Sequence, residues 1–121
     1  MKAITIFTAI LFSFFTINSA SAQAKKTESI KVWGNCGQCK KNIEKAAKKA
    51  GATSATWSIS TKMLAMTYPT AKTNSLKIQQ AIGKAGYDTQ DVTADDKAYN
   101  SLDGCCQYDR KPAVKGPNPT H

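Results

Sequence analysis

The sequence predicts a small α+β domain whose elements follow the order β-α-β-β-α-β. Short runs in which every second residue is apolar alternate with two helix-like segments, whose apolar residues recur every three or four positions. Both helix-like segments end in the same three residues, Lys-Ala-Gly, at 49–51 and 84–86, so residues 23–94 form two similar halves. This element order is that of a split βαβ sandwich, the ferredoxin-like fold.

The first half is predicted to be a strand followed by a helix. We expect the strand over Glu28–Trp33, with Ile30 and Val32 on one face. The helix opens at Cys39 and ends before Gly51, because glycine is the usual residue just beyond a helix C-terminus. Its apolar stripe consists of Ile43, Ala46, Ala47 and Ala50.

The second half is predicted to be a β-hairpin, a helix and a short strand. Two alternating runs form the hairpin, Ala55/Trp57/Ile59 and Leu64/Met66/Tyr68. Asn74 or Thr73 caps the second helix and Gly86 closes it. Its stripe consists of Ile78, Ala81, Ile82 and Ala85, and Ile43 and Ile82 are expected in the core. Residues 87–94 form a polar edge strand.

Residues 1–22 have the composition of a secretory signal peptide. Lys2 precedes an apolar run over Ile4–Ile17, and the small residues at 20–22 offer a cleavage site. The apolar run is too short for a comfortable membrane span. We therefore expect an exported protein, periplasmic if the source is a Gram-negative bacterium, with no membrane insertion of the mature chain.

The chain is strongly basic and lacks the residue sets of common enzymes. Its 17 lysines and arginines stand against 8 aspartates and glutamates, and loss of Lys2 with the signal peptide would leave 16 against 8, a net charge of +8. Such a surplus suits nucleic acid, anionic lipid or an acidic protein, and export argues against nucleic acid. No Ser/His/Asp set, catalytic carboxylate pair or phosphate loop can be assembled, so an enzyme is not predicted.

Cys36 and Cys39 stand at the start of the first predicted helix. Negative charge is favoured at a helix N-terminus, so both thiols should ionise more readily than usual. The spacing of three lets both sulfurs converge on one point, and Gly37 between them permits a tight loop. Two soft thiolates without a nearby histidine or carboxylate favour soft ions, above all Cu(I), with Zn(II), Hg(II) and Cd(II) as further candidates.

These residues resemble the heavy-metal-associated domain of copper chaperones, of metal-pumping ATPase N-termini and of periplasmic mercury-binding proteins. The resemblance covers roughly residues 28–93 and lies in the CxxC after the first strand, the following AAKKAGA, and Gly86-Tyr87-Asp88 in the second helix-to-strand loop. It implies that Cys36 and Cys39 are metal ligands of a carrier that passes its ion on by thiolate exchange.

The resemblance also implies roles for residues around the metal loop. Tyr87 would lie beside the loop as a shield, and the loop itself contains Gly34, Asn35, Gly37 and Gln38. The family's loop usually has a methionine two residues before the first cysteine. Gly34 stands at that position, in a loop that is one residue shorter, and Trp33 is expected to replace some of the lost packing.

Two other functions remain open for the cysteine pair. Thiol-disulfide exchange proteins also place CxxC between a strand and a helix. A permanent disulfide in a small exported interaction module is the third possibility, although so short a loop would add little stability.

Residues 95–121 form a C-terminal extension of different composition. We expect a short helix over Asp95–Leu102 and disorder in the last ten residues. Cys105 and Cys106 are adjacent, and ring strain opposes a disulfide between them. We hypothesise that this segment folds back over the site and adds one or two thiolates; pairing with another chain or a purely structural role is the alternative.

Lys40, Lys41 and Lys45 follow the cysteine pair on the same predicted helix. They form either an ordinary solvated face or a docking surface. In the second case the partner would be a metal-donor or metal-acceptor protein, acidic or membrane-bound, that electrostatic attraction steers to the metal loop.

Overall fold

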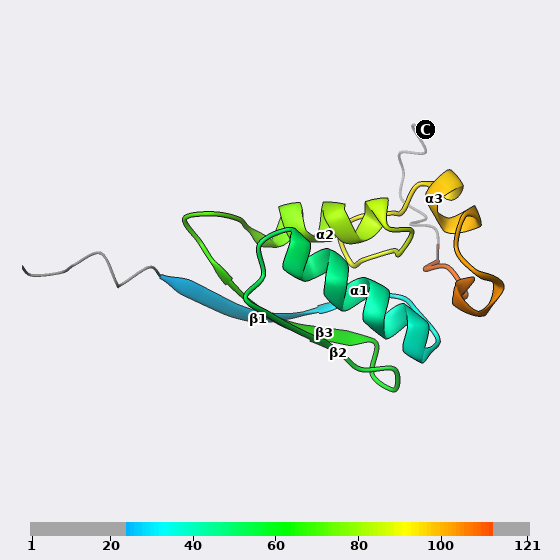
Figure 1. The fold of residues 1–121 in the computed structure, drawn as a ribbon, viewed down its shortest axis with the longest axis horizontal. Helices are drawn as coiled ribbons and strands as arrows, with labels where there is room; N and C mark the ends of the chain where they lie inside the picture. The colour runs from blue at the N-terminus through cyan, green and yellow to red at the C-terminus, as the bar shows by residue number, and fades with distance from the viewer. Residues whose placement is uncertain (1–23, 113–121) are drawn as a thin grey trace, which may run out of the picture.

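The computed structural model describes residues 24–112 and has the predicted α+β, ferredoxin-like fold. Two helices, α1 (Gly37–Lys49) and α2 (Ser75–Lys84), cover one face of an antiparallel sheet (Figure 1). The sheet has the order β1-β3-β2 and consists of β1 (Lys25–Lys31), β2 (Ser54–Trp57) and β3 (Met63–Pro69). The predicted signal peptide and most of the predicted disordered tail lie outside the described residues. Within those residues, no helix is both long enough and apolar enough to cross a membrane.

The core lies between the sheet and the two helices. Ile30 of β1 pairs with Leu64 of β3, and both side chains are buried. The helices meet them with Ile43 and Ile82, which are fully buried as predicted. Inward positions along each element thus follow the period of two in strands and about 3.6 in helices.

Helix boundaries largely follow the predicted caps. The side chain of Asn74 accepts a hydrogen bond from the N–H of Lys77 (2.9 Å) at the start of α2. Gly51 and Gly86, just beyond the two helices, have positive φ angles of 114° and 107°, which glycine adopts without strain. The predicted start of α1 at Cys39 is wrong by two residues, because α1 begins at Gly37 and Cys36 is its N-cap.

The predicted fourth strand over residues 87–94 is reduced to one β-bridge, between Val32 and Thr89. The backbone folds back after Thr89, whose N–H donates to the carbonyl of Val92 (2.8 Å). The buried side chain of Gln79 holds this turn by accepting from the Thr89 hydroxyl (2.7 Å) and from the N–H of Asp91 (3.1 Å). Polar side-chain contacts with α2 therefore take the place of most of the backbone hydrogen bonds that a fourth strand would form with β1.

The predicted alternation of the hairpin fails at Ile59, which is 44% exposed. The strand ends at Trp57, and a loop closes where the N–H of Lys62 donates to the carbonyl of Ser58 (2.9 Å). Ile59 belongs to this loop, so the period of two no longer applies to it.

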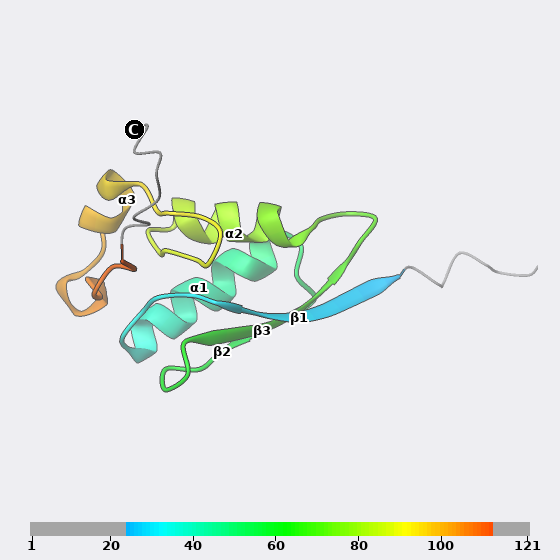
Figure 2. The ribbon, with the colours of Figure 1, turned by 180° about the vertical axis from the view of Figure 1, so that it is seen from behind.

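The C-terminal extension folds against the end of the domain at which α1 begins. It contains the short helix α3 (Asp96–Asn100), within the predicted Asp95–Leu102, and a 3₁₀ turn, η2 (Gly104–Cys106). Both views show this segment, coloured yellow to orange, beside the start of α1 and far from the start of β1 (Figures 1 and 2).

Asp88 and Arg110 fasten the extension to the domain. The Asp88 side chain is 1% exposed and accepts from Arg110 Nε and Nη2, both at 2.8 Å. It also accepts from the N–H groups of Ala94 (2.7 Å) and Lys111 (3.2 Å). Burial favours the neutral acid, but these donors prevail and lower the pKa of Asp88.

Replacing Arg110 should release the extension. Arg110→Ala leaves the buried Asp88 carboxylate without its bidentate partner, and we expect the free energy of unfolding to fall by about 2 kcal/mol. Urea denaturation measures the loss, and hydrogen exchange should show faster exchange at Cys106 and Tyr108. Lys97→Ala removes an exposed cation from the same extension and serves as control. Equal stability of both variants would contradict this anchor.

Candidate metal centre

The first turn of α1 brings Cys36 and Cys39 together. Cys36 caps the helix with sulfur: its backbone is extended (φ −148°, ψ 172°), and its Sγ accepts from the N–H of Cys39 at 3.3 Å. The two Sγ atoms lie 3.2 Å apart. Cys39 is fully buried and Cys36 is partly exposed, so only the cap residue meets solvent.

A third sulfur joins the pair from the C-terminal extension. The Sγ of Cys106 lies 3.5 Å from that of Cys36, and the three sulfurs lie within 4.8 Å of one another. We call Cys36, Cys39 and Cys106 the thiol cluster. Cys106 is 1% exposed, whereas Cys105 is exposed with its Sγ 3.9 Å from that of Cys106. All four cysteines are free thiols in the structure.

Their surroundings shift the thiol pKa values of Cys36 and Cys106 in opposite directions. Burial opposes ionisation of Cys36, but the N–H of Cys39, the thiols of Cys39 and Cys106 and the N–H of Gln38 lower its pKa to about 7. Burial raises the pKa of the Cys106 thiol well above its ordinary value, and hydrogen bonds to Cys36 and Cys39 add to the effect. In the metal-free protein, Cys36 therefore ionises more readily than Cys106.

The loop before Cys36 packs tightly on Trp57. A Cβ at Gly34 would lie 2.9 Å from the Trp57 ring and 3.2 Å from the Cys39 Cβ, so glycine is needed there for close approach. Trp57 donates from Nε1 to the carbonyl of Val32 (3.0 Å) and is itself buried. The ring of Trp57 therefore fills the space beneath the loop, the role that the sequence had suggested for Trp33.

Among the other loop residues, Asn35 and Gln38 contact the pair and Gly37 does not. The Asn35 Oδ1 accepts from the Cys39 thiol at 3.2 Å, and the N–H of Gln38 favours the Cys36 thiolate. A Cβ at Gly37 would meet nothing within 4 Å, and its φ is not among the positive ones. Gly37 was expected to permit a tight loop; in the structure it is the first residue of α1, and neither its surroundings nor its φ angle requires glycine.

Tyr87 lies behind the cluster, as a fully buried side chain. Its hydroxyl accepts from Asn42 Nδ2 at 2.9 Å, and its ring stacks on Tyr108 with centroids 5.6 Å apart. Burial raises the pKa of Tyr87, so its hydroxyl stays protonated. This neutral group adjoins the Cys106 thiol and favours its ionised form.

Sequence reasoning missed three residues that shape the site, Asn42, Tyr108 and Arg110. Asn42 sits on the polar side of α1, where its type carries no distinctive pattern. Tyr108 and Arg110 lie in a segment without helical or strand periodicity, and their partners Gly86 and Asp88 are 22 residues away. Only the proximity of Tyr108 and Arg110 to Cys105-Cys106 in the sequence could have drawn attention to them.

Several solved structures resemble this chain in fold and in part of its sequence. The CopZ metallochaperone is 30% identical with a TM-score of 0.50, and the match covers 53% of this chain and 98% of CopZ. Oxidized MerP from Ralstonia metallidurans CH34 is 29% identical with a TM-score of 0.53, over 55% of this chain and 96% of MerP. No family model and no curated protein matches the sequence.

This chain belongs to the heavy-metal-associated domain family. The water-soluble region of the P-type ATPase CopA from Bacillus subtilis also matches, at 32% identity and a TM-score of 0.51, over 55% of this chain and 46% of that region. The heavy-metal-associated domain accounts for nearly all of CopZ but only 53% of this chain, so much of this chain has no counterpart in CopZ.

The lysines of α1 differ in whether their charge is already paired. Lys40 forms an ion pair with Glu44 and also donates to the carbonyl of Trp57 (3.2 Å), so its charge is already engaged. Lys41 and Lys45 are exposed and, with Lys48 and Lys49, line a shallow hollow around Glu44. Lys41, Lys45, Lys48 and Lys49 therefore give α1 an exposed positive face.

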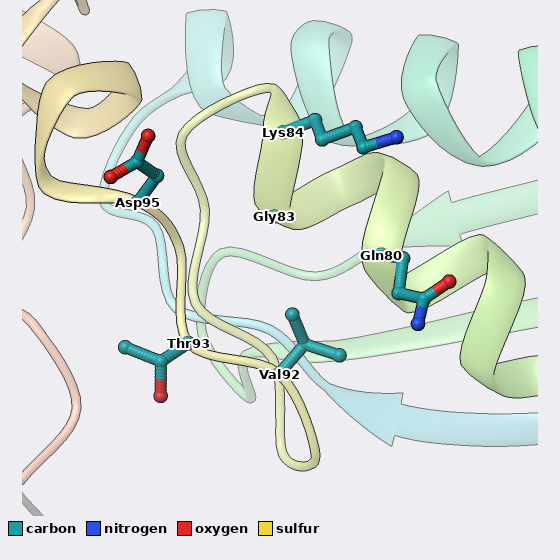
Figure 3. A pocket seen from close by; sticks show the side chains of 6 residues that line it. All are labelled: Gln80, Gly83, Lys84, Val92, Thr93 and Asp95. Carbon is teal, nitrogen blue, oxygen red and sulfur yellow. The ribbon is translucent and has the colours of Figure 1, made fainter. Parts of the chain in front are cut away.

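A separate pocket lies between α2 and the segment that leads to α3 (Figure 3). Its lining residues are Gln80, Gly83, Lys84, Val92, Thr93 and Asp95. Its polar side chains offer only oxygen and nitrogen donors, and soft metals prefer sulfur. The pocket therefore plays no part in the thiol cluster.

The alkylation rate of Cys36 should report its lowered pKa. Only the thiolate reacts with iodoacetamide, so in the reduced, metal-free protein the rate should be half-maximal near pH 7 and level off about one pH unit higher. Cys106 should stay largely unmodified over the same range because it is buried and protonated. Mass spectrometry of proteolytic fragments measures both. A Cys36 midpoint near the ordinary value of 9.0 would contradict the described environment.

Proposed function

We propose that this chain is an exported carrier or buffer of a soft metal ion, Cu(I) first, that binds through Cys36 and Cys39. The observation that carries the proposal is the convergence of two free thiols, with Sγ atoms 3.2 Å apart, at the N-terminus of α1. Sulfur donors select thiophilic ions, so Zn(II), Hg(II) and Cd(II) compete with Cu(I) as the natural cargo.

The helix start supports thiolate ligation. The first N–H groups of α1 have no intrahelical partners and the helix dipole is positive there. The N–H groups of Gln38 and Cys39 point to the Cys36 sulfur, and the pKa of about 7 gives this residue a large thiolate fraction at neutral pH. Cys36 is also the partly exposed member of the pair. It would therefore meet an incoming or outgoing partner first, while the buried Cys39 anchors the ion.

The partner in this proposal is a metal-donor or metal-acceptor protein. One matched structure is a metallochaperone and another is the water-soluble region of a P-type ATPase. Lys41, Lys45, Lys48 and Lys49 give α1 a positive outer face that suits an acidic or membrane-bound partner. Export follows from the signal peptide predicted over residues 1–22.

Thiol-disulfide exchange is the second candidate, and the same geometry favours it. Two sulfurs 3.2 Å apart, one with a pKa of about 7, can also form and break a disulfide. A matched structure is that of an oxidized protein, MerP. Reductase activity in a disulfide-reduction assay would favour this candidate, whereas reversible metal binding without such activity favours the carrier.

Metal titration of the reduced protein tests the carrier directly. Under anaerobic conditions and against a chromogenic Cu(I) competitor, we expect saturation at one Cu(I) per chain. Cys36→Ser should strongly weaken competition, because it removes one ligand of the pair and the cap of α1. Cys105→Ser removes an exposed thiol outside the pair and should leave the stoichiometry unchanged. Parallel titrations with Zn(II) and Hg(II) rank the ions. Failure of all three ions to bind would exclude the carrier function.

A further inference from the structure

We propose that the chain holds its metal ion with three thiolates, and that Cys106 of the C-terminal extension is the third ligand. This inference rests on the proposed function, because it assigns a further ligand to the same soft-metal site. The sulfur of Cys106 lies 3.5 Å from that of Cys36, in a cluster whose three sulfurs are all within 4.8 Å of one another.

The size of the thiol cluster suits three-coordinate binding. With metal–sulfur bonds of about 2.3 Å, three thiolates in a plane lie about 4.0 Å apart, whereas two in a line lie about 4.6 Å apart. The sulfur of Cys36 lies 3.2 Å from that of Cys39 and 3.5 Å from that of Cys106. These distances need only roughly 0.5 to 0.8 Å of spreading to enclose an ion in the trigonal arrangement.

The backbone around Cys106 is fixed on both sides. The N–H of Cys106 donates to the carbonyl of Asp103 (2.7 Å), which forms the η2 turn, and the carbonyl of Cys106 accepts from the N–H of Tyr108 (2.9 Å). The Tyr99 hydroxyl donates to the carbonyl of Tyr108 at 2.6 Å, and the two rings pack edge to face. Cys106 therefore reaches the cluster as part of a packed segment.

Tyr108 links this segment to the loop behind the cluster. Its buried hydroxyl donates to the carbonyl of Gly86 and accepts from the N–H of Asp88, both at 2.7 Å. Arg110 then adds the bidentate contact with the Asp88 carboxylate. The extension thus binds to the Gly86-Tyr87-Asp88 loop of the domain. These contacts bring Cys106 to the ligand pair.

The chemistry of the cluster defines the class of ion. On binding, each coordinated thiol loses its S–H proton to solvent and forms one metal–sulfur bond, and no electrons are transferred. Three thiolates around Cu(I) leave two negative charges, which the N-terminus of α1 partly offsets. Hg(II) and Cd(II) also suit such a donor set, whereas Zn(II) would keep a fourth position to fill.

The third thiolate changes how the ion leaves. Cys39 and Cys106 are buried, so a partner approaches through Cys36 alone. The partner's thiolate must compete with Cys106, which the folded extension holds at a high effective concentration. The chain should therefore retain its ion longer than a two-thiolate domain and release it when the extension moves away.

The test compares two chains that both lack Cys105, so that this neighbour cannot substitute for Cys106. Cys105→Ser retains the thiol cluster, and Cys105→Ser/Cys106→Ser reduces it to a pair. In anaerobic competition against a chromogenic Cu(I) chelator, both should bind one Cu(I). We expect the double variant to bind at least about tenfold more weakly than Cys105→Ser, and to lose its ion faster to excess chelator. Cys105→Ser itself should match the unmodified chain.

A second variant tests whether the folded position of the extension matters for metal affinity when all three sulfurs are present. Cys105→Ser/Arg110→Ala keeps all three sulfurs but loses the anchor of the extension, so its affinity should also fall below that of Cys105→Ser. Near-ultraviolet circular dichroism of the tyrosines reports whether each variant keeps its packing. Equal affinities and release rates for Cys105→Ser and Cys105→Ser/Cys106→Ser would overturn the third ligand while leaving the Cys36/Cys39 carrier intact. Failure of the unmodified chain to bind Cu(I), Zn(II) or Hg(II) would overturn both proposals.

Discussion

The N-terminus of α1 places a sulfur where most helices place a side-chain oxygen. The Cys36 Sγ accepts the N–H of Cys39 at 3.3 Å where the helix begins, with Cys39 buried and Cys36 partly exposed. A thiolate accepts such a hydrogen bond better than a thiol does, so the fold itself favours the charged form. The same interaction that begins the helix therefore prepares the Cys36/Cys39 pair for thiolate chemistry.

The C-terminal extension brings a third sulfur to this pair. Cys106 lies 3.5 Å from Cys36, and the anchors Tyr108 and Arg110 bind the loop that contains Asp88. CopZ is matched over 98% of its length by only 53% of this chain. The extension adds Cys106 to the Cys36/Cys39 pair, and two of the three clustered thiols, those of Cys39 and Cys106, are buried. Retention of an ion, rather than rapid exchange, is the property that such a change favours.

The local structure could be predicted where one residue type decides a conformation. Gly51 and Gly86 end their helices with positive φ, and Asn74 caps α2, as their types indicate. The start of α1 was misplaced because a sulfur cap lies outside the usual preference for oxygen. Ile59 was misassigned because the period of two says nothing about where a strand stops.

The features that could not be predicted from the sequence depend on contacts between distant segments of the chain. The fourth strand fails because Gln79, from a different element, binds Thr89 and the N–H of Asp91. Cys106 could be suggested as a neighbour of the pair because the connecting segment is long enough to return. Its burial could not, because that depends on Tyr108 meeting Tyr87 and on Arg110 meeting Asp88. No periodic pattern encodes contacts between segments some twenty residues apart.

X-ray absorption spectroscopy of the Cu(I)-loaded, reduced chain tests the central claim most directly, because it counts the sulfur atoms bound to the ion. The structure predicts a shell of three sulfurs at a single copper–sulfur distance, in the full chain and without added thiol. A two-sulfur shell with shorter bonds would show that Cys106 stays outside the site. A shell of nitrogen and oxygen donors would contradict the thiol cluster as the metal centre altogether.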